Sequence, residues 1–441
     1  MGHIRLALAL AAKHGWEIQQ MDVCTAFLGS VLREDIYMHP PAGYMQLRQL
    51  ALKEGNHKPV WKLLRSLYGL KQSPYEWYHT LRQYLKSLSF HLSRLDGGFF
   101  IFTSEKQPHT RVILSIYVDD ILLLGTYTLI SQLKEEMKER FEIHDLGEAL
   151  LYLGMSIERE QEKRSILLGQ SHYVQTVLER FKMHESNPVS TPMDPKIRLV
   201  KRSDIDKPCD QALYQSMLGS VMYLMTGTRP DISYTVEVLS RFGHDPSKQH
   251  MAVMIRLLRY LKGTKDWKLR IGGASSQLKV YGDADYAGCR DDFKSTSGFV
   301  IIYGGAVDWP SHKEKSVAQS TTDAEYYAFR HACIRLLKAS HLLHKMGIAE
   351  TSPPVLYSDN ESCLKSLRNG IYRSTEGATH ISTKFFLAAD QVQEGKVEVA
   401  YVSTTEMLAD GFTKPLLKPA HQHFCRMIGH VGATLTTHSG V

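Results

Sequence analysis

Neither a paired cysteine motif nor a membrane-length apolar run occurs in this chain of 441 residues. The six cysteines are scattered without a CxxC pair, which argues against a zinc ribbon and against a dense disulfide framework. The longest apolar runs, Val112–Tyr117 and Ile121–Leu124, are far shorter than the roughly 20 residues of a membrane helix, and Asp119 and Asp120 separate them. We therefore predict a protein that is not embedded in a membrane.

A clear cleavage site for a signal peptide is missing as well. The apolar segment Leu6–Ala12 is short, and Glu17 and Asp22 follow it without the small-residue pattern of a cleavage site. We interpret this segment as part of a helix. Together with the scattered cysteines, it predicts an intracellular, cytoplasmic protein that is not secreted.

Internal repeats and low-complexity tracts are absent too, and 43% apolar with 22% charged residues is an ordinary globular composition. A chain of this length is too long for one hydrophobic core and suits about two to four domains. The formal net charge of +7 suits a polyanionic partner but is a modest excess over 441 residues. The charge therefore favours nucleic-acid binding only weakly.

What the sequence does contain is an alternation of strand-like and helix-like segments. Val112–Tyr117 and Ile121–Leu124 are expected to pair as an antiparallel hairpin whose turn exposes two carboxylates. Apolar residues at spacings of three and four from Ile130 to Phe141 predict an amphipathic helix directly after it. Further expected elements are a strand at Ile18–Asp22, helices at Pro74–Leu88 and Tyr173–Phe181, an extended linker at Asn187–Pro195, mostly helix over 210–262, strands at Leu278–Gly282, Gly298–Tyr303, Val355–Tyr357 and Val397–Val402, and a long helix over 328–343.

Three aspartates in the first part of the chain indicate metal chemistry. Asp119 and Asp120 lie at the hairpin tip, and Asp22 ends a strand that can neighbour the hairpin in one sheet. Nucleotidyl transfer uses two divalent cations, one activating the attacking hydroxyl and one holding the triphosphate, and Mg²⁺ prefers carboxylate oxygens. By pattern alone, an aspartate pair between apolar strands can also be an ordinary turn.

The residues around these aspartates favour the metal site. Gln20–Leu28, Leu67–Pro74 and Tyr117–Asp120 occur in the order found in reverse transcriptases of Copia-type (Ty1/Copia) LTR retrotransposon Pol polyproteins, which the chain resembles. The resemblance covers nearly the whole chain and continues through Tyr152–Met155, Thr191–Met193, Gly219–Ser220 and Thr228–Ile232. Several long motifs in one order are far more specific than a lone YVDD tetrapeptide.

The resemblance implies roles for several of these residues. Asp22, Asp119 and Asp120 would be the metal-binding triad of the polymerase. Phe27 would lie against the sugar of the incoming nucleotide and exclude a 2′-hydroxyl, or else be an ordinary core phenylalanine. Nucleotide or template contacts are also implied for Gly69, Lys71, Gln72 and Tyr117.

Some of these segments have plainer interpretations. Gly69–Pro74 can equally be a turn before the helix that contains Trp77. Lys71, Trp77 and Arg229 are candidates for contact with nucleic acid, although aromatic and basic side chains also pack in cores or lie at the surface.

Acidic residues in the C-terminal part form a second candidate site. Hydrolysis of the RNA strand of a hybrid also uses two cations, with water as the nucleophile and about four acidic side chains. Strand ends and helix starts of one α/β unit tend to meet at one edge, which would join Asp283, Glu325, Asp359 and Asp410. Pattern alone does not separate these from nearby acids that can be helix caps or surface groups: Asp285, Asp291, Asp292, Asp323 and Glu361.

The resemblance extends to this region and selects four acids. The segments similar to the ribonuclease H domain of the same elements are Tyr281–Gly288, Lys294–Gly298, Ser320–Tyr326, Ser358–Asn360 and Leu408–Leu416. They imply that Asp283, Glu325, Asp359 and Asp410 form the catalytic, metal-binding tetrad. His380 would help product leave or be an ordinary surface histidine, and Ile381–Thr383 departs from the usual acidic sequence after it.

The predicted architecture is α/β and multidomain: a truncated palm-type reverse transcriptase at 1–145, a thumb and helical connection at 146–275, a ribonuclease H-like α/β domain at 276–420 and a tail at 421–441. The implied activities are RNA-directed DNA polymerase and RNA–DNA hybrid ribonuclease, with two Mg²⁺ per site or Mn²⁺ in their place. Implied partners are an RNA template, a DNA primer, the RNA–DNA hybrid and deoxynucleoside triphosphates. Element-derived particles or the nucleus are further expected locations, and the sequence does not indicate an oligomeric state.

Two departures from the family bear on the polymerase half. Only Arg5, Lys13 and two histidines precede Asp22 as basic residues, whereas the family has a longer basic fingers segment upstream. Integrase, protease and capsid parts are also missing, so we expect a partial copy of an element. Three hypotheses stay open: both activities, a ribonuclease with an inactive polymerase half, and a non-catalytic remnant that binds nucleic acid.

Overall fold

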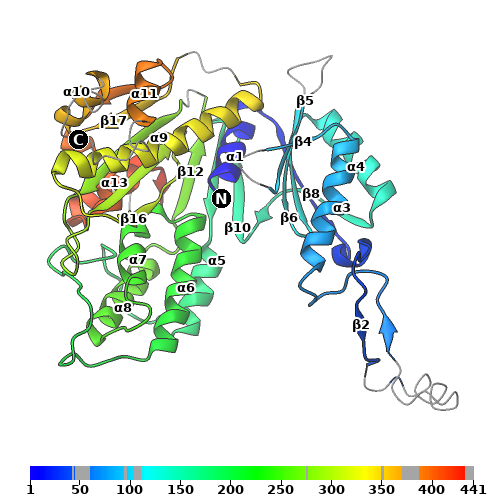
Figure 1. Cartoon of the computed structure of the whole chain (residues 1–441), viewed down its shortest axis with the longest axis horizontal. Helices are drawn as coiled ribbons and strands as arrows, with labels where there is room; N and C mark the ends of the chain where they lie inside the picture. Colours follow the sequence, from blue (N-terminus) through cyan, green and yellow to red (C-terminus); the bar gives the residue numbers. More distant parts are fainter. Residues whose placement is uncertain are drawn as a thin grey trace. The chain divides into compact units, whose positions relative to one another are not determined.

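Two compact units make up the chain (Figure 1). The computed structural model describes residues 1–41, 44, 60–93, 97–103, 111–274, 277–348, 352–369 and 387–432. The smaller unit is Glu17–Ala149, and the larger unit combines Met1–Trp16 with Leu150–Val441. The predicted division into four domains is a different and finer one, and it stays a prediction. Across the part of the chain that the structure describes, none of the helices combines the length and apolarity that a membrane crossing requires.

The smaller unit is built on a six-stranded antiparallel sheet. The strands, in spatial order, are β4 (His91–Leu92), β5 (Phe99–Thr103), β6 (Arg111–Tyr117), β7 (Asp120–Gly125), β1 (Glu17–Val23) and β8 (Ile143–Glu148). The hairpin predicted from the two apolar runs is therefore confirmed as β6 and β7, and the predicted first strand as β1. Placing β1 beside β7 brings residues about 100 positions apart in sequence next to each other.

Two helices bury their apolar sides in the core of this unit. On α3 (Ser73–Ser87), Trp77, Leu81 and Leu85 recur every four residues and are at most 2% exposed. Helix α4 (Tyr127–Arg140) buries its own apolar stripe in the same core cluster, which confirms the predicted amphipathic helix. The remaining described elements are the 3₁₀ turn η1 (Ala26–Gly29) and a short ribbon of β2 (Tyr37–Met38) with β3 (Trp61–Lys62).

The larger unit contains a five-stranded antiparallel sheet that the sequence patterns did not predict. Its strands, in spatial order, are β19 (His430–Val431), β12 (Lys268–Gly272), β11 (Ser165–Gly169), β10 (Met155–Glu160) and β9 (Leu151–Tyr152). Its helices are α5 (Ser171–Arg180), α6 (Gln211–Gly227), α7 (Ser233–Ser240) and α8 (Lys248–Gly263), with the 3₁₀ turn η2 (Pro230–Ile232) between α6 and α7. The expected helical stretch over 210–262 is confirmed, with η2 interrupting it at Pro230.

A second sheet in the larger unit has the strand order β15-β14-β13-β17-β18, with β16 also paired to β14. Its strands are β13 (Lys279–Asp285), β14 (Thr296–Ile302), β15 (Ala306–Asp308), β16 (Ser311–Lys313), β17 (Val355–Ser358) and β18 (Glu398–Tyr401). The first three strands form an antiparallel meander, and β13, β17 and β18 run parallel. The long helix α9 (Thr321–Lys345) packs on β13 and β14. This is the arrangement of a ribonuclease H-like domain, and the predicted α/β multidomain class is confirmed.

The N-terminal helix α1 (Gly2–His14), which contains the segment Leu6–Ala12 expected to be helical, belongs to the larger unit. Residues Ile4–Ala12 are all buried, so this part of the helix is enclosed on every side, and Arg5 is its one charged residue. Within it, Arg5 donates to the carbonyls of Val307, Thr226 and Gly227 and lies over the ring of Trp309. Burial lowers the pKa of Arg5 to about 9, and these carbonyls hold its guanidinium.

Candidate active sites

Strand pairing brings the three predicted aspartates of the smaller unit together. Asp22 on β1 is the direct cross-strand partner of Asp120 on β7. Asp119 lies in the two-residue turn between Tyr117 and Asp120, which are themselves partners at the end of the hairpin. One sheet edge therefore carries all three carboxylates.

The local electrostatics of this group centre on Asp120. Partial burial raises the pKa of Asp120, and the nearby carboxylates of Asp119 and Asp22 add to the rise. The side-chain amide of Gln20 on β1 donates to Asp120 Oδ1 at 3.2 Å, and this hydrogen bond lowers the pKa of Asp120. A cation bound here would relieve the repulsion among the three acids.

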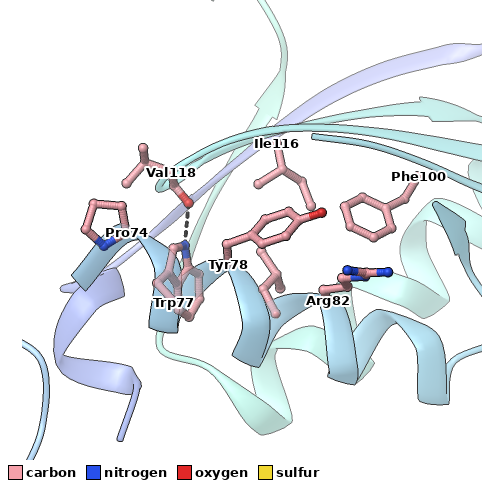
Figure 2. A pocket seen from close by; sticks show the side chains of 8 residues that line it. Pro74, Trp77, Tyr78, Arg82, Phe100, Ile116 and Val118 are labelled. Atoms are coloured by element: carbon pink, nitrogen blue, oxygen red, sulfur yellow. Dashed lines mark hydrogen bonds between the residues drawn. The ribbon is translucent and has the colours of Figure 1, made fainter. Parts of the chain in front are cut away.

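The turn that presents Asp119 is held in a strained conformation. Val118 has φ of 60°, a left-handed value that a β-branched residue rarely adopts. The indole Nε1 of Trp77 donates to the Val118 carbonyl at 2.6 Å, as Figure 2 shows. Trp77 is only 2% exposed, so the suggestion that it contacts nucleic acid is wrong. Instead, Trp77 fixes the backbone just before the aspartate pair.

A small, mainly apolar pocket lies between α3 and the sheet beside this turn (Figure 2). Its volume is about 160 Å³, and it is lined by Pro74, Trp77, Tyr78, Leu81, Arg82, Phe100, Ile116 and Val118. Trp77 and Val118 thus belong both to the pocket wall and to the support of the aspartate turn.

The residues predicted to contact the nucleotide or template lie in varied surroundings. Phe27 in η1 is 9% exposed, belongs to the core cluster and packs on Tyr68 with ring centroids 4.7 Å apart. Tyr117, at the hairpin, is 62% exposed. Gly69 has φ of 94°, which suits glycine, and an added Cβ would meet no described atom within 4 Å.

The neighbouring polar positions lie beside Gly69 in the same turn. Lys71 is exposed, and Gln72 donates to Glu34 Oε2 at 2.8 Å. The contacts of these five positions with substrate stay predictions.

The second acidic group is assembled in the ribonuclease H-like sheet. One carboxylate oxygen each from Asp283, Glu325 and Asp359 lies within 4.8 Å of the others. Asp283 is in β13, Asp359 directly follows the parallel neighbour β17, and Glu325 is in the first turns of α9. Asp283 and Glu325 are only 5% and 7% exposed, so these charges are close together and largely shielded from water.

Asp410 completes this group from the start of α12 (Asp410–Thr413). Burial and the charge of Asp283 raise its pKa to about 7, while an ion pair with Lys414 at 2.8 Å opposes the rise. Thr413 of the same turn donates its hydroxyl to Asp283. The fourth predicted acid therefore lies beside the first.

The buried carboxylates cannot all be ionised easily without a cation. Burial, followed by the charges of Asp283 and Asp359, raises the pKa of Glu325 well above its usual range. In addition, Glu325 Oε2 is buried and has no hydrogen-bond partner among the described residues. Asp359 accepts from Thr404 at 2.9 Å. Hard oxygen donors with a free lone pair pointing inward fit Mg²⁺ or Mn²⁺.

Nearby acids that the sequence left as alternatives mostly have other contacts. Asp291 accepts the backbone N–H of Lys201, and Asp292 pairs with Lys313 and Lys294. Asp323 lies in the first turn of α9, and Glu361 is exposed beside Lys365. Asp285 is the exception, because burial and the charge of Asp283 raise its pKa. Asp285 is therefore the closest competitor to the predicted tetrad.

Two further residues show what the sequence patterns could and could not reveal. His380, with Ile381–Thr383, lies outside the described residues, so its role in product release stays a prediction. Lys414 was overlooked, although its position four residues after Asp410 is the spacing of a helical ion pair.

Of the two interpretations of Arg229, contact with nucleic acid or packing in the protein, the structure supports packing. It is 1% exposed and pairs with Asp231 at 2.7 Å inside the larger unit.

An antiparallel sheet with aspartates at its hairpin, joined in one chain to a ribonuclease H-like sheet, defines the class of reverse transcriptases with a ribonuclease H domain. Comparison with known proteins agrees with this class. Residues 1–195 match the family described as reverse transcriptase (RNA-dependent DNA polymerase).

Three relatives specify the family further. The chain is 36% identical to the retrovirus-related Pol polyprotein from transposon RE1 of Arabidopsis thaliana over 97% of its own length, and 37% identical to that from transposon TNT 1-94 of Nicotiana tabacum over 94%. It is 32% identical to the putative transposon Ty5-1 protein of Saccharomyces cerevisiae, covering 97% of that protein and 69% of itself. The chain belongs to the Copia-type family of retrotransposon reverse transcriptases. It spans 28% and 31% of the length of the two plant polyproteins.

Proposed function

We propose that this chain is an RNA-directed DNA polymerase that also cleaves the RNA of an RNA–DNA hybrid. The observation that carries the proposal is that acids far apart in sequence meet in two separate carboxylate groups. Each group has the oxygen donors that a pair of Mg²⁺ ions requires, with Mn²⁺ as a substitute. Membership in the reverse transcriptase family and the ribonuclease H-like sheet support the same function.

In the polymerase site, Asp22, Asp119 and Asp120 would hold the cations at the sheet edge. Bound divalent ions supply charge neutralisation for the triphosphate and lower the pKa of the attacking hydroxyl. The chain's own contribution is positioning, since Trp77 fixes the Val118 carbonyl and Gln20 orients Asp120. The carboxylates then meet the substrate without a change in the backbone of the turn.

Nucleotide selection in this proposal depends on the residues around the same edge. Phe27, held in the core against Tyr68, is rigid enough to exclude a 2′-hydroxyl from the sugar position. Tyr117 presents an exposed ring beside the aspartates, on which a base can stack. Gly69, Lys71 and Gln72 form a turn whose backbone and cationic side chain suit a template phosphate.

In the ribonuclease site, Asp283, Glu325, Asp359 and Asp410 would hold the second cation pair. Burial and the charges of Asp283 and Asp359 raise the pKa of Glu325, so a cation held by these carboxylates would favour its ionised form. Lys414 balances part of the charge of Asp410. Asp285 lies two positions after Asp283 in β13, and burial followed by the charge of Asp283 raises its pKa as well.

The proposed partners follow from this chemistry: an RNA template, a DNA primer, their hybrid and deoxynucleoside triphosphates. The proposed location is inside the cell, where these substrates occur.

One assay tests both halves of the proposal. Purified protein is incubated with a primed RNA template, deoxynucleotides and Mg²⁺, and wild type is compared with Asp119→Asn and Asp359→Asn. We expect Asp119→Asn to abolish primer extension and leave hybrid cleavage, and Asp359→Asn to do the reverse. Hybrid cleavage without extension in the wild type would favour a ribonuclease with an inactive polymerase half. A folded protein with neither activity would overturn the proposal in favour of a non-catalytic remnant.

A further inference from the structure

A third group of potential metal ligands lies on the ribonuclease H-like sheet and contains two histidines. His312 is in β16, Glu314 directly follows this strand, and His331 is in α9. One ligand atom from each lies within 4.8 Å of the others. None of these three residues belongs to the carboxylate groups described above.

The distances within this group fit a tetrahedral metal ion. His312 Nε2 lies 3.1 Å from Glu314 Oε1, and His331 Nε2 lies 3.7 Å from the same oxygen. With metal–ligand bonds of about 2.0–2.2 Å, neighbouring ligands of a tetrahedral zinc ion are about 3.3 Å apart. The two measured distances lie on either side of this value.

The ligand atoms are turned toward one another. His312 Nε2 and Glu314 Oε1 are buried and lie 3.1 Å apart, and neither makes a hydrogen bond of good geometry among the described residues. The neighbours of the Glu314 carboxylate are the two imidazoles and the Ser297 hydroxyl. Two atoms that approach each other without a good hydrogen bond can both point at a third atom. The side chain of Glu314 is 10% exposed, so its carboxylate has little access to water.

The supporting elements hold these ligands in place. Strand β16 pairs with β14, and the backbone N–H of Glu314 donates to the Ser295 carbonyl at 2.9 Å. His331 is near the middle of the 25-residue helix α9. The rings of His312 and His331 meet edge to face with centroids 4.6 Å apart, and both side chains are about one-third exposed. An ion can therefore enter from solvent and keep a water as its fourth ligand.

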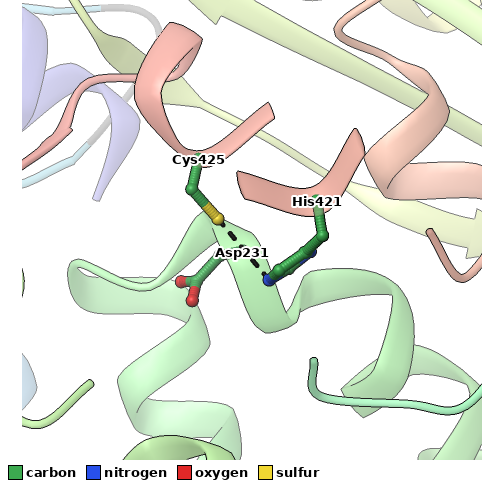
Figure 3. A group of neighbouring side chains, drawn as sticks. All are labelled: Asp231, His421 and Cys425. Atoms are coloured by element: carbon green, nitrogen blue, oxygen red, sulfur yellow. Dashed lines mark hydrogen bonds between the residues drawn. The ribbon is translucent and has the colours of Figure 1, made fainter. Parts of the chain in front are cut away.

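A second cluster with similar residue types has no carboxylate oxygen left to bind a metal ion. Asp231, His421 and Cys425 approach one another inside the larger unit (Figure 3). However, Asp231 Oδ1 accepts from Arg229 and His430, and Oδ2 accepts from Arg229 and Tyr260. Its carboxylate is fully occupied and sits beside a buried guanidinium, which would repel a cation.

From this geometry we infer that His312, Glu314 and His331 form a binding site for a zinc-class divalent ion. The two imidazoles and one carboxylate select Zn²⁺ over Mg²⁺, because Mg²⁺ prefers a shell of oxygen atoms. The ion ties β16 to α9, the helix that also carries Glu325 (Figure 1). Its role is to stabilise this strand and helix together, separately from the proposed cleavage of hybrids.

The test uses the full chain after treatment with a chelator and Co²⁺ as a spectroscopic probe for the zinc site. Excess Mg²⁺ is present, so that the carboxylate groups are occupied. We expect one Co²⁺ per chain with the intense visible absorption of tetrahedral coordination, displaced by Zn²⁺. His312→Ala and His331→Ala should each weaken binding by at least about tenfold, and Glu314→Gln should do the same with little change in side-chain shape.

His344→Ala is the matched control, because His344 is exposed on the same helix and should leave the absorption unchanged. Asp359→Asn should also leave it unchanged, which separates this site from the proposed ribonuclease site. Absence of the tetrahedral band in folded wild-type protein would overturn the inference without reference to any variant. Full retention of the band in both histidine variants would overturn it as well.

Discussion

The two acidic groups of this chain contain the same kinds of side chain but are built in different ways. In the smaller unit, the aspartates lie at the end of a two-residue hairpin, are partly exposed and have the 62% exposed Tyr117 beside them. In the larger unit, the acids come from two parallel strands and two helices, and Asp283 and Glu325 are almost fully buried. The hairpin group depends on one turn conformation, whereas in the sheet group the carboxylates are buried so close together that Asp283 raises the pKa of Glu325 and Asp410.

The largest expected effect would show whether these groups are functionally separate. Asp283→Asn removes the carboxylate whose charge raises the pKa of both Glu325 and Asp410. We expect hybrid cleavage to fall by at least about 10²–10³-fold. Primer extension should stay near the wild-type rate, because the hairpin group lies in the other unit. Cleavage and extension rates on one labelled hybrid measure both.

Glu361→Gln is the control for Asp283→Asn, since Glu361 is an exposed acid that follows the neighbouring strand β17, and it should change neither rate. Equal loss of both activities in Asp283→Asn would contradict the separation of the two sites.

An intermediate effect is expected from the support of the hairpin. Trp77→Phe keeps an aromatic ring in the core but removes the hydrogen bond to the Val118 carbonyl. A partly buried carbonyl that loses its donor costs up to about 1–3 kcal/mol, and the turn can relax from its left-handed conformation. We expect extension to fall by about 10–100-fold, mainly in kcat, with hybrid cleavage unchanged.

The matched control for Trp77→Phe is Leu81→Ala, one helical turn later and equally buried, which destabilises the same core without touching the turn. If Leu81→Ala lowers kcat as much as Trp77→Phe at a temperature where both are folded, Trp77 has no positioning role.

The smallest effect concerns stability in the absence of metal. The pKa of Asp410 is 3.8 for the free side chain and about 7 in the folded protein, so between these values the folded state holds a proton that the unfolded chain has released. In chelator, the stability contribution of Asp410 therefore falls as the pH rises through this window. We expect Asp410→Asn to melt about 2–4 °C higher than wild type at pH 8, which corresponds to about 1 kcal/mol.

This difference should shrink toward zero as the pH falls below 3.8, where the carboxyl becomes protonated in both states. Added Mg²⁺ should reverse the order, because the wild type gains a ligand that the variant lacks. Melting curves by circular dichroism at several pH values follow both changes. A lower melting temperature for Asp410→Asn at pH 8 in chelator would show that its ion pair with Lys414 outweighs the repulsion from Asp283.

Elements that depend only on a short stretch of sequence were predicted correctly. The β6–β7 hairpin has two apolar runs around an acidic turn, and α9 has a long apolar stripe ended by Gly347. The sheet of β9 to β12 and β19 was missed because its strands are short and mix charged with apolar residues, as in Met155–Glu160. Pairing of β11 with β12 joins residues about 100 positions apart, which no local pattern specifies.

The site predictions divide in the same way. The acids could be selected from the sequence because their motifs resemble a family, but their convergence depends on β1 lying beside β7 and on β13 lying beside β17. The roles of Trp77 and Arg229 were left open because an aromatic or basic side chain gives no local sign of whether it is buried. The zinc-class site was not foreseen, since Glu314 and His331 meet only when α9 packs on the sheet.

The docking of helix α1 has a consequence for the order of events during synthesis. Arg5 binds the carbonyl of Val307, 302 positions later, so this apolar helix leaves the ribosome long before its binding place exists. At 5–20 residues per second, the delay is about 15–60 s. The smaller unit is translated entirely within that interval and can fold first, while the first helix has to be kept from aggregating until the last third of the chain arrives.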